Sequence, residues 1–231
     1  MACIKLCKDF INENHCKGIA YYKYEDWTSK KANTLFVCGY SGSGKSTIGK
    51  KIAKENAAYY VELDNFYESD SYGSFTNEIN SSLWEKFYKS FYYEKFREKN
   101  VIVKEKTWED PDFVRKIFKE FFLFRIDYAI KDKQNKYVLE GVQFVFYEDL
   151  FSTFSKYPMM VIGTSLIKSS IRRALRNYKE YKYDKDSKVK FIFLCFYEAF
   201  KDNIVRIDRR LKKLKKYLGV ACIRGAEVGL K

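Results

Sequence analysis

A short glycine-rich stretch carries the residue types with the most specific chemistry in this chain. Residues 39–47 read Gly-Tyr-Ser-Gly-Ser-Gly-Lys-Ser-Thr, which fits the pattern G-x-x-x-x-G-K-S. Glycines let backbone N–H groups turn inward around phosphate oxygens, the lysine reaches the β and γ phosphates, and the serine hydroxyl can ligate magnesium. The stretch predicts nucleoside-triphosphate binding, with ATP and Mg²⁺ as the expected cofactors. The predicted nucleotide-binding residues are Gly39, Ser41, Gly42, Ser43, Gly44, Lys45, Ser46 and Thr47.

Two carboxylates follow or close apolar runs further along the chain. Asp64 follows the run 59–63, and Glu140 ends the run 137–140. In an open parallel sheet, ligands collect outside the carboxyl ends of the strands, so both acids are expected on the edge that carries the glycine loop. Glu140 is therefore the candidate partner of Ser46 in a magnesium site, although an ordinary strand end would show the same pattern.

Three arginines form a second group with a chemical interpretation. Arg172, Arg173 and Arg176 occur on a helical pattern that follows the apolar run 159–162. Their guanidinium groups could close over a transferring phosphate, where a fixed fork supplies charge-assisted hydrogen bonds. A merely solvated basic helix is the competing interpretation. Ser165 is expected to cap this helix.

These residues require a sheet that brings strand ends and helix starts together. The patterns predict an α/β fold with a mainly parallel sheet, because short apolar runs alternate with helical periodicity. The predicted strands are 35–38, 59–63, 137–140 and 159–162. The predicted helices are 46–56, 111–130 and one that begins after Ser165.

The predicted organisation is one domain with additions. Residues 1–33 are expected to be an N-terminal extension that packs on the domain, and residues 34–190 the nucleotide-binding domain. This domain includes a helical insertion at about 70–103, where Leu83 and Phe87 belong to an apolar series near helical spacing. A partly buried helix explains that series better than an aromatic platform for nucleic acid.

The C-terminal region, 191–231, is expected to be helical and packed on the same domain. Five apolar residues repeat there at alternating three- and four-residue intervals, with basic residues between them. Such a seam packs on a domain or on another subunit, so a homo-oligomer stays open. Nucleic-acid contact is the less common explanation and is not favoured. The apolar residues of the seam are Ile204, Ile207, Leu211, Leu214 and Leu218.

Composition limits the remaining classes of protein. The chain has 231 residues and a formal net charge of +14, from 44 Lys plus Arg against 30 Asp plus Glu. This charge attracts phosphorylated ligands or nucleic acid, and it equally fits a solvated surface. The sequence contains no apolar run of membrane-spanning length and no secretory core near its start, so we expect a soluble cytoplasmic protein without a membrane partner.

Five stretches occur in an order that resembles the uridine kinase branch of the P-loop kinases. They are residues 39–47, Asp-Asn-Phe-Tyr at 64–67, Trp-Glu-Asp-Pro-Asp at 108–112, Glu-Gly at 140–141 and Arg-Arg-Ala-Leu-Arg at 172–176. The glycine loop is specific for nucleotide binding, whereas the other motifs are short and gain force from their order. The resemblance covers roughly residues 34–180. It implies a P-loop NTPase three-layer sandwich and ATP-dependent phosphorylation of a hydroxyl.

The resemblance also implies roles for individual residues. Asp64 would act as the base at the acceptor hydroxyl, and Tyr67 would border the substrate. Glu109 falls where the family places the aspartate that holds the ribose. The three arginines at 172, 173 and 176 would correspond to the family's lid arginines. The expected acceptor is a hydroxyl of a nucleoside-like or related small molecule.

Two other classes of function share the glycine loop. The first is a nucleotide-dependent switch, or an ATPase that acts on nucleic acid, which the net charge would suit. The second is a kinase with another acceptor, either a nucleotide-sugar, as in zeta-toxin-like kinases, or the 5′ hydroxyl of a polynucleotide. The identity of the product distinguishes these classes.

Overall fold

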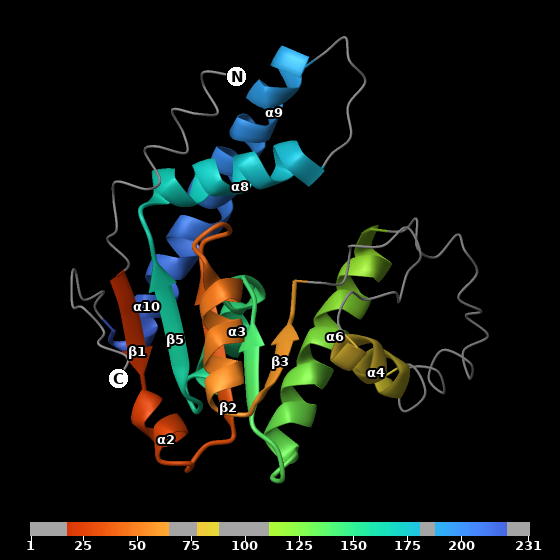
Figure 1. Ribbon diagram of the computed structural model, residues 1–231, viewed down its shortest axis with the longest axis vertical. Coiled ribbons are helices and arrows are strands. Elements are labelled where there is room, and N and C mark those ends of the chain that lie inside the picture. The colour runs from red at the N-terminus through yellow and green to blue at the C-terminus, as the bar shows by residue number, and fades with distance from the viewer. Residues whose placement is uncertain (1–17, 65–77, 88–110, 181–187, 221–231) are drawn as a thin grey trace.

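Within the part of the chain that the structure describes, a five-stranded sheet forms the centre (Figure 1). The computed structural model describes residues 18–64, 78–87, 111–180 and 188–220. The strand order is β1-β5-β2-β4-β3, in which β2 to β5 run parallel and β1 is antiparallel to β5. The four predicted strands are confirmed, and the fold is α/β. The strands are β1 (Gly18–Tyr22), β2 (Thr34–Gly39), β3 (Tyr59–Glu62), β4 (Tyr137–Glu140) and β5 (Met159–Gly163).

Helices connect these strands and extend the chain beyond the last one. The predicted helices behind the glycine loop, after Pro111 and after Ser165 are confirmed as α3, α6 and α8. The helices are α2 (Tyr24–Thr28), α3 (Lys45–Glu55), α4 (Glu78–Phe87), α6 (Pro111–Lys131), α7 (Phe151–Phe154), α8 (Leu166–Glu180), α9 (Lys188–Lys201) and α10 (Arg209–Leu218). A π-helical turn, Asp202–Asp208, joins α9 to α10, and two 3₁₀ turns, Gln143–Val145 and Glu148–Leu150, follow β4.

Both faces of the sheet are covered by helices, so its central strands are apolar on both sides. In β2, Leu35 and Val37 pack with α2 and α3, whereas Phe36 and Cys38 pack with α6 and α10. Figure 1 shows α3 in front of the sheet and α10 behind it. This two-sided burial explains why β2 reads as a continuous apolar run rather than an alternating one.

The region before Asn33 contributes a strand that was not predicted. It was expected to be an extension in front of the first strand, but β1 pairs with β5 from Gly18 opposite Gly163 to Tyr22 opposite Met159. Tyr21 packs toward α3 and Tyr22 toward the opposite face of the sheet. Because both faces of this short strand are partly apolar, it lacks the alternation that marks an edge strand.

The π-helical turn overturns one part of the predicted C-terminal seam. Ile207, Leu211, Leu214 and Leu218 are buried in the core, but Ile204 is 48% exposed. An uninterrupted α-helix would place Ile204 on the same face as Ile207 and Leu211. The π turn changes the register there, so Asn203 faces inward instead.

The structure describes part of the predicted helical insertion. Of the predicted insertion at about 70–103, residues 78–87 form α4 and the others lie outside the described residues.

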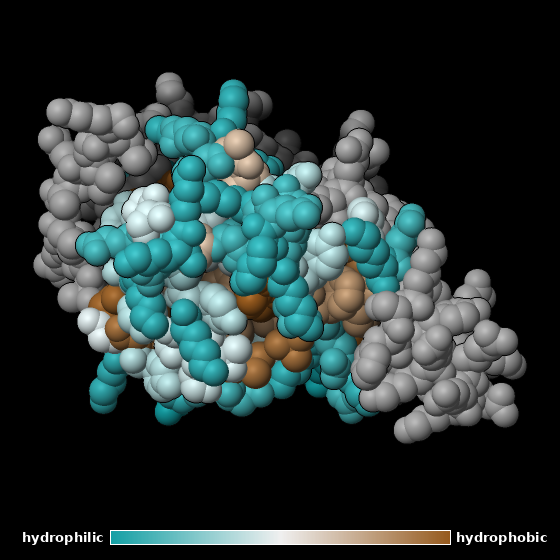
Figure 2. All heavy atoms as spheres, turned by 90° about the horizontal axis from the view of Figure 1, so that it is seen from below, coloured by the Kyte–Doolittle hydropathy of each residue, from teal (hydrophilic) through white to brown (hydrophobic). Residues whose placement is uncertain are grey.

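Within the described ranges, no helix has both the length and the apolar character that crossing a membrane requires. Among the described residues, the surface at the amino ends of the parallel strands is mostly hydrophilic, with hydrophobic patches between the hydrophilic residues (Figure 2).

Candidate functional site

The glycine loop joins the end of β2 to the start of α3 and lies against α8. Gly42 adopts a φ of +83°, and a Cβ atom at this position would lie 2.2 Å from the carbonyl oxygen of Ser169 in α8. Only glycine accommodates both this conformation and this contact. Gly44 immediately precedes α3, so the amino end of that helix opens at the loop. The loop therefore has the geometry that anion binding at a helix N-terminus requires.

A cavity of about 390 Å³ lies at the loop and brings the separately predicted groups together. Its lining residues come from the loop after β2, the start of α3, the end of β3 and α8. Figure 1 shows that these elements meet at the carboxyl ends of the parallel strands. Glu62, the last residue of β3, joins the lining although no motif singled it out. The lining residues are Ser41, Gly42, Gly44, Lys45, Ser46, Thr47, Glu62, Asp64, Arg172, Arg173 and Arg176.

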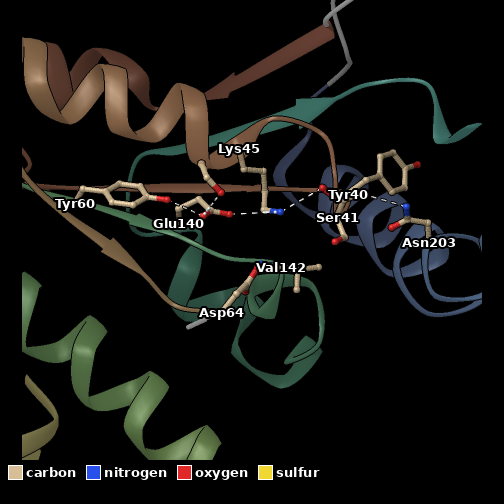
Figure 3. A network of polar contacts seen from close by, with 9 residues as sticks. Tyr40, Ser41, Lys45, Tyr60, Asp64, Glu140, Val142 and Asn203 are labelled. Carbon is tan, nitrogen blue, oxygen red and sulfur yellow. Dashed lines mark hydrogen bonds and ion pairs between the residues drawn. The ribbon is translucent and has the colours of Figure 1, made fainter. Parts of the chain in front are cut away.

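Glu140 does not line the cavity, but it is the centre of a buried polar network that includes the lining residues Lys45 and Ser46 (Figure 3). Ser46 Oγ and Tyr60 Oη both donate hydrogen bonds to Glu140 Oε2, at 3.0 and 2.9 Å. Lys45 Nζ lies 3.4 Å from Glu140 Oε1 and donates a hydrogen bond to the carbonyl oxygen of Tyr40 at 3.2 Å. Lys45 and Glu140 are only 5% and 1% exposed. Their opposite charges thus stabilise each other in a buried setting.

The same network has the ligand atoms that a magnesium ion prefers. The predicted metal ligands, Ser46 and Glu140, are within hydrogen-bond distance of each other. Glu140 Oε1 is buried and accepts no hydrogen bond from the described residues, and its ion-pair partner Lys45 Nζ is 3.4 Å away, so this hard oxygen keeps coordinating capacity. In the described segments, no group of three or more His, Cys, Asp or Glu side chains could hold a metal. A magnesium ion here would take its other ligands from phosphate and water, as such sites commonly do.

Asp64 lies at the carboxyl end of β3, beside the end of β4. Its Oδ1 accepts a hydrogen bond of 3.0 Å from the backbone N–H of Val142 (Figure 3). A Cβ at Gly141 would lie 2.9 Å from Leu63 Cβ, so glycine is needed for this close approach of the two strand ends. Burial raises the pKa of the Asp64 carboxyl, nearby Glu140 raises it further, and Lys45 opposes both. Asp64 is therefore a stronger base than a solvated aspartate.

Arg125 of α6 is a functional candidate that motif reasoning missed. Its guanidinium group is fully buried and donates hydrogen bonds to the carbonyl oxygens of Glu62 and Leu63, at 3.2 and 3.0 Å. It also lies 4.1 Å from the centre of the Phe121 ring. Burial lowers the pKa of Arg125 to about 9, while the charge of Asp64 opposes that change. The arginine fixes the end of β3, and hence the backbone that carries Asp64. A lone arginine among apolar residues of a helix was the available signal.

The three predicted arginines line the cavity, and one of them is held firmly. Arg173 Nη2 lies 2.5 Å from Asp202 Oδ2 of the π-helical turn, and Arg206 lies 3.0 Å from the other oxygen of that carboxylate. The Arg173 side chain is only 21% exposed. Arg173 is therefore part of a packed ion-pair group, rather than a solvated residue of a basic helix.

The remaining predicted residues, and one that was overlooked, lie in different parts of the chain. Tyr67 and Glu109, the predicted substrate-binding residues, lie outside the described residues. Ser165 immediately precedes α8, and its carbonyl oxygen accepts a hydrogen bond from the N–H of Ser169. Asn203, which no sequence pattern singled out, donates a hydrogen bond to the carbonyl oxygen of Ser41 in the glycine loop.

Comparison with known proteins adds no assignment to this geometry. No protein-family model matches the chain, and no curated protein sequence matches it. Functional inference therefore depends on the chemistry of the site.

Proposed function

We propose that this protein transfers the γ-phosphate of ATP to a hydroxyl of a nucleoside-like or related small molecule. One observation carries the proposal: the glycine loop, a carboxylate with a raised pKa and three arginines line a single 390 Å³ cavity. Binding of a triphosphate alone would require only the loop. A kinase also needs a base for the acceptor and positive charge around the transferring group.

The phosphate-binding half of the reaction belongs to the loop and Lys45. Backbone N–H groups of the loop and the start of α3 would surround the phosphate oxygens, and Lys45 would exchange its Tyr40 contact for the β and γ phosphates. A magnesium ion held by Ser46 and Glu140 would supply charge neutralisation at the phosphates.

The transfer half belongs to Asp64 and the arginines. Asp64 would orient the acceptor hydroxyl and take its proton, for which a raised pKa is favourable. Arg172, Arg173 and Arg176 would stabilise the charge spread over the transferring group. The protein's contribution is then positioning and electrostatic stabilisation, since phosphoryl transfer asks for little covalent chemistry from the enzyme.

The architecture supports a more specific fold assignment as part of the same proposal. A loop at the carboxyl end of a central parallel strand, followed directly by a helix on one face, is the arrangement expected of a P-loop NTPase. Helices on both faces of the sheet agree with a three-layer sandwich.

Identification of the labelled product tests the proposal. The protein is incubated with γ-labelled ATP, Mg²⁺ and a panel of nucleosides, nucleotides, sugars and oligonucleotides, with Lys45→Met as the inactive control. We expect label on a small hydroxyl compound. Label confined to inorganic phosphate, with stimulation by nucleic acid, would instead support the ATPase alternative. Label at an oligonucleotide 5′ end would keep the kinase chemistry and change the acceptor class.

A further inference from the structure

We infer that the π-helical turn Asp202–Asp208 anchors the phosphate loop, and that Asn203 is a positioning residue for phosphate binding. This inference rests on the proposed function, because it concerns the same nucleotide site. The turn lies far from the loop in sequence, since Asn203 comes 162 positions after Ser41. None of its residues belongs to the loop motif or to the arginine helix.

Three side chains of this one turn contact residues of the glycine loop or of α8. Asn203 Nδ2 donates hydrogen bonds to the Ser41 carbonyl oxygen at 3.2 Å and to Ser170 Oγ at 3.0 Å (Figure 3 shows the contact with Ser41). Asp202 forms the ion pair with Arg173. At the other end of the turn, Asp208 accepts a hydrogen bond from the hydroxyl of Tyr40. Two consecutive loop residues and one cavity arginine are thus held by the same seven-residue turn.

The turn has an energetic cost that points to a role in function. It exposes Ile204, which an α-helical register would bury, and it buries Asn203 completely. The Asn203 Oδ1 atom has no hydrogen-bond partner in the described structure. Exposing an apolar side chain and burying an unpartnered polar atom both reduce stability. π-helical turns are rare within helices and frequently occur at functional sites.

The contact with Ser41 has a direct geometric consequence for the loop. In a trans peptide, the C=O of one residue and the N–H of the next point in opposite directions. By fixing the Ser41 carbonyl, Asn203 also fixes the N–H of Gly42, a residue that lines the cavity, on the side away from Asn203. A loop whose donors are already oriented loses less conformational freedom when it binds phosphate.

Nucleotide-binding measurements on matched variants test this role. Asn203→Ala should raise the Kd of a non-hydrolysable ATP analogue roughly three- to tenfold, as expected for the loss of one or two hydrogen bonds. The loss of affinity should be larger for the ATP analogue than for AMP. A general loosening of the fold would instead weaken the binding of both nucleotides by the same factor. Ile204→Ala, at the exposed neighbour in the same turn, is the control and should leave both Kd values unchanged.

Two more variants separate the loop contact from packing. Ser170→Ala removes the other partner of Asn203 and should have less effect than Asn203→Ala. Tyr40→Phe deletes only the hydroxyl that binds Asp208, and it provides an independent test if Asn203→Ala does not fold. Wild-type protein that fails to bind the analogue would refute the proposed function. Wild-type binding with unchanged affinity in both Asn203→Ala and Tyr40→Phe would overturn the anchoring role alone.

Discussion

At the residue scale, the buried pair of Lys45 and Glu140 is expected to affect both the proposed phosphoryl transfer and the stability of the fold. Each charge is compensated mainly by the other, and Glu140 gains two hydrogen bonds from Ser46 and Tyr60. A substitution at one member leaves the other as an uncompensated charge in a buried position. The functional and structural consequences of such a substitution can be separated, because a second substitution can remove the stranded charge.

We predict that Lys45→Met reduces phosphoryl transfer on the order of a hundredfold or more and lowers the free energy of unfolding by about 3 kcal/mol. Adding Glu140→Gln should restore much of the stability, since the unpaired carboxylate is gone, but none of the activity. Chemical denaturation and product assays on both variants measure the two effects. An active double variant would contradict the role of Lys45 in binding phosphate.

Asp64→Asn should separate nucleotide binding from transfer. The amide keeps the size of the side chain and can still accept the hydrogen bond from Val142, but it cannot take a proton. We expect near-normal binding of an ATP analogue and no detectable transfer. Asp127→Asn, at an exposed position paired with Lys131, is the control and should be fully active. Normal turnover by Asp64→Asn would refute the base assignment.

The pKa shift of Asp64 predicts how stability depends on pH. Burial raises this pKa above 3.8 in the folded protein, so the folded chain keeps the proton to higher pH than the unfolded chain does. As pH rises from 3.8 through the raised pKa, the contribution of Asp64 to stability should therefore fall, and it should be constant at higher pH. Denaturation of wild type and Asp64→Asn across this range isolates the contribution. If the free energy of unfolding of wild type, minus that of Asp64→Asn, rose with pH in this range, the result would contradict the direction of the pKa shift.

At the element scale, the π-helical turn makes two similar residues unequal. Ile204 and Leu211 occur in the same apolar repeat, but Leu211 is fully buried and Ile204 is largely exposed. We predict that Leu211→Ala lowers the free energy of unfolding by roughly 2–5 kcal/mol, and that Ile204→Ala changes it by less than about 0.5 kcal/mol. Denaturant unfolding measures both values. Equal losses would indicate an uninterrupted α-helix.

Local residue patterns were sufficient to predict the elements that can be identified from nearby sequence alone. The runs that became β2, β4 and β5 are apolar on both faces, so their sequences needed no knowledge of their partners. The glycine loop begins at the last residue of β2, and Asp64 lies two residues after the end of β3, so both positions could be predicted from the strands before them.

Tertiary contacts determined the elements and residues that local patterns missed. Strand β1 is recognisable only by its pairing with β5. Arg125 and Asn203 act through backbone carbonyls that are distant in sequence, and the polar character of Asn203 is compatible with either an exposed or a buried position. No short-range rule places such residues at a site.

At the scale of the whole molecule, β1 and α2 belong to the folded unit. β1 covers one edge of β5, and Trp27 of α2 is completely buried against the face of the sheet that α3 also covers. The boundary predicted before residue 34 therefore separates β1 and α2 from the sheet, although β1 is one of its strands and α2 packs on its face.

We predict that a chain beginning at Asn33 is less stable than one beginning at Gly18, and aggregates more readily. Its β5 would become an exposed edge with unpaired backbone groups, and the Trp27 site would be empty. Denaturation and size-exclusion chromatography compare the two chains, and the chain beginning at Gly18 retains every described element. Equal stability and equal elution would show that the sheet does not depend on β1.

The pairing of β1 with β5 also has a consequence for biosynthesis. The hydroxyl of Tyr22 bonds the carbonyl oxygen of Ser155, a partner 133 residues later in the chain. Ribosomes add roughly 5–20 residues per second, so β1 leaves the exit tunnel roughly 7–28 seconds before its partner strand β5 does. During that interval the apolar side chains on both faces of β1 have no sheet to join. A chaperone that holds short apolar segments near the ribosome would therefore raise the yield of folded protein.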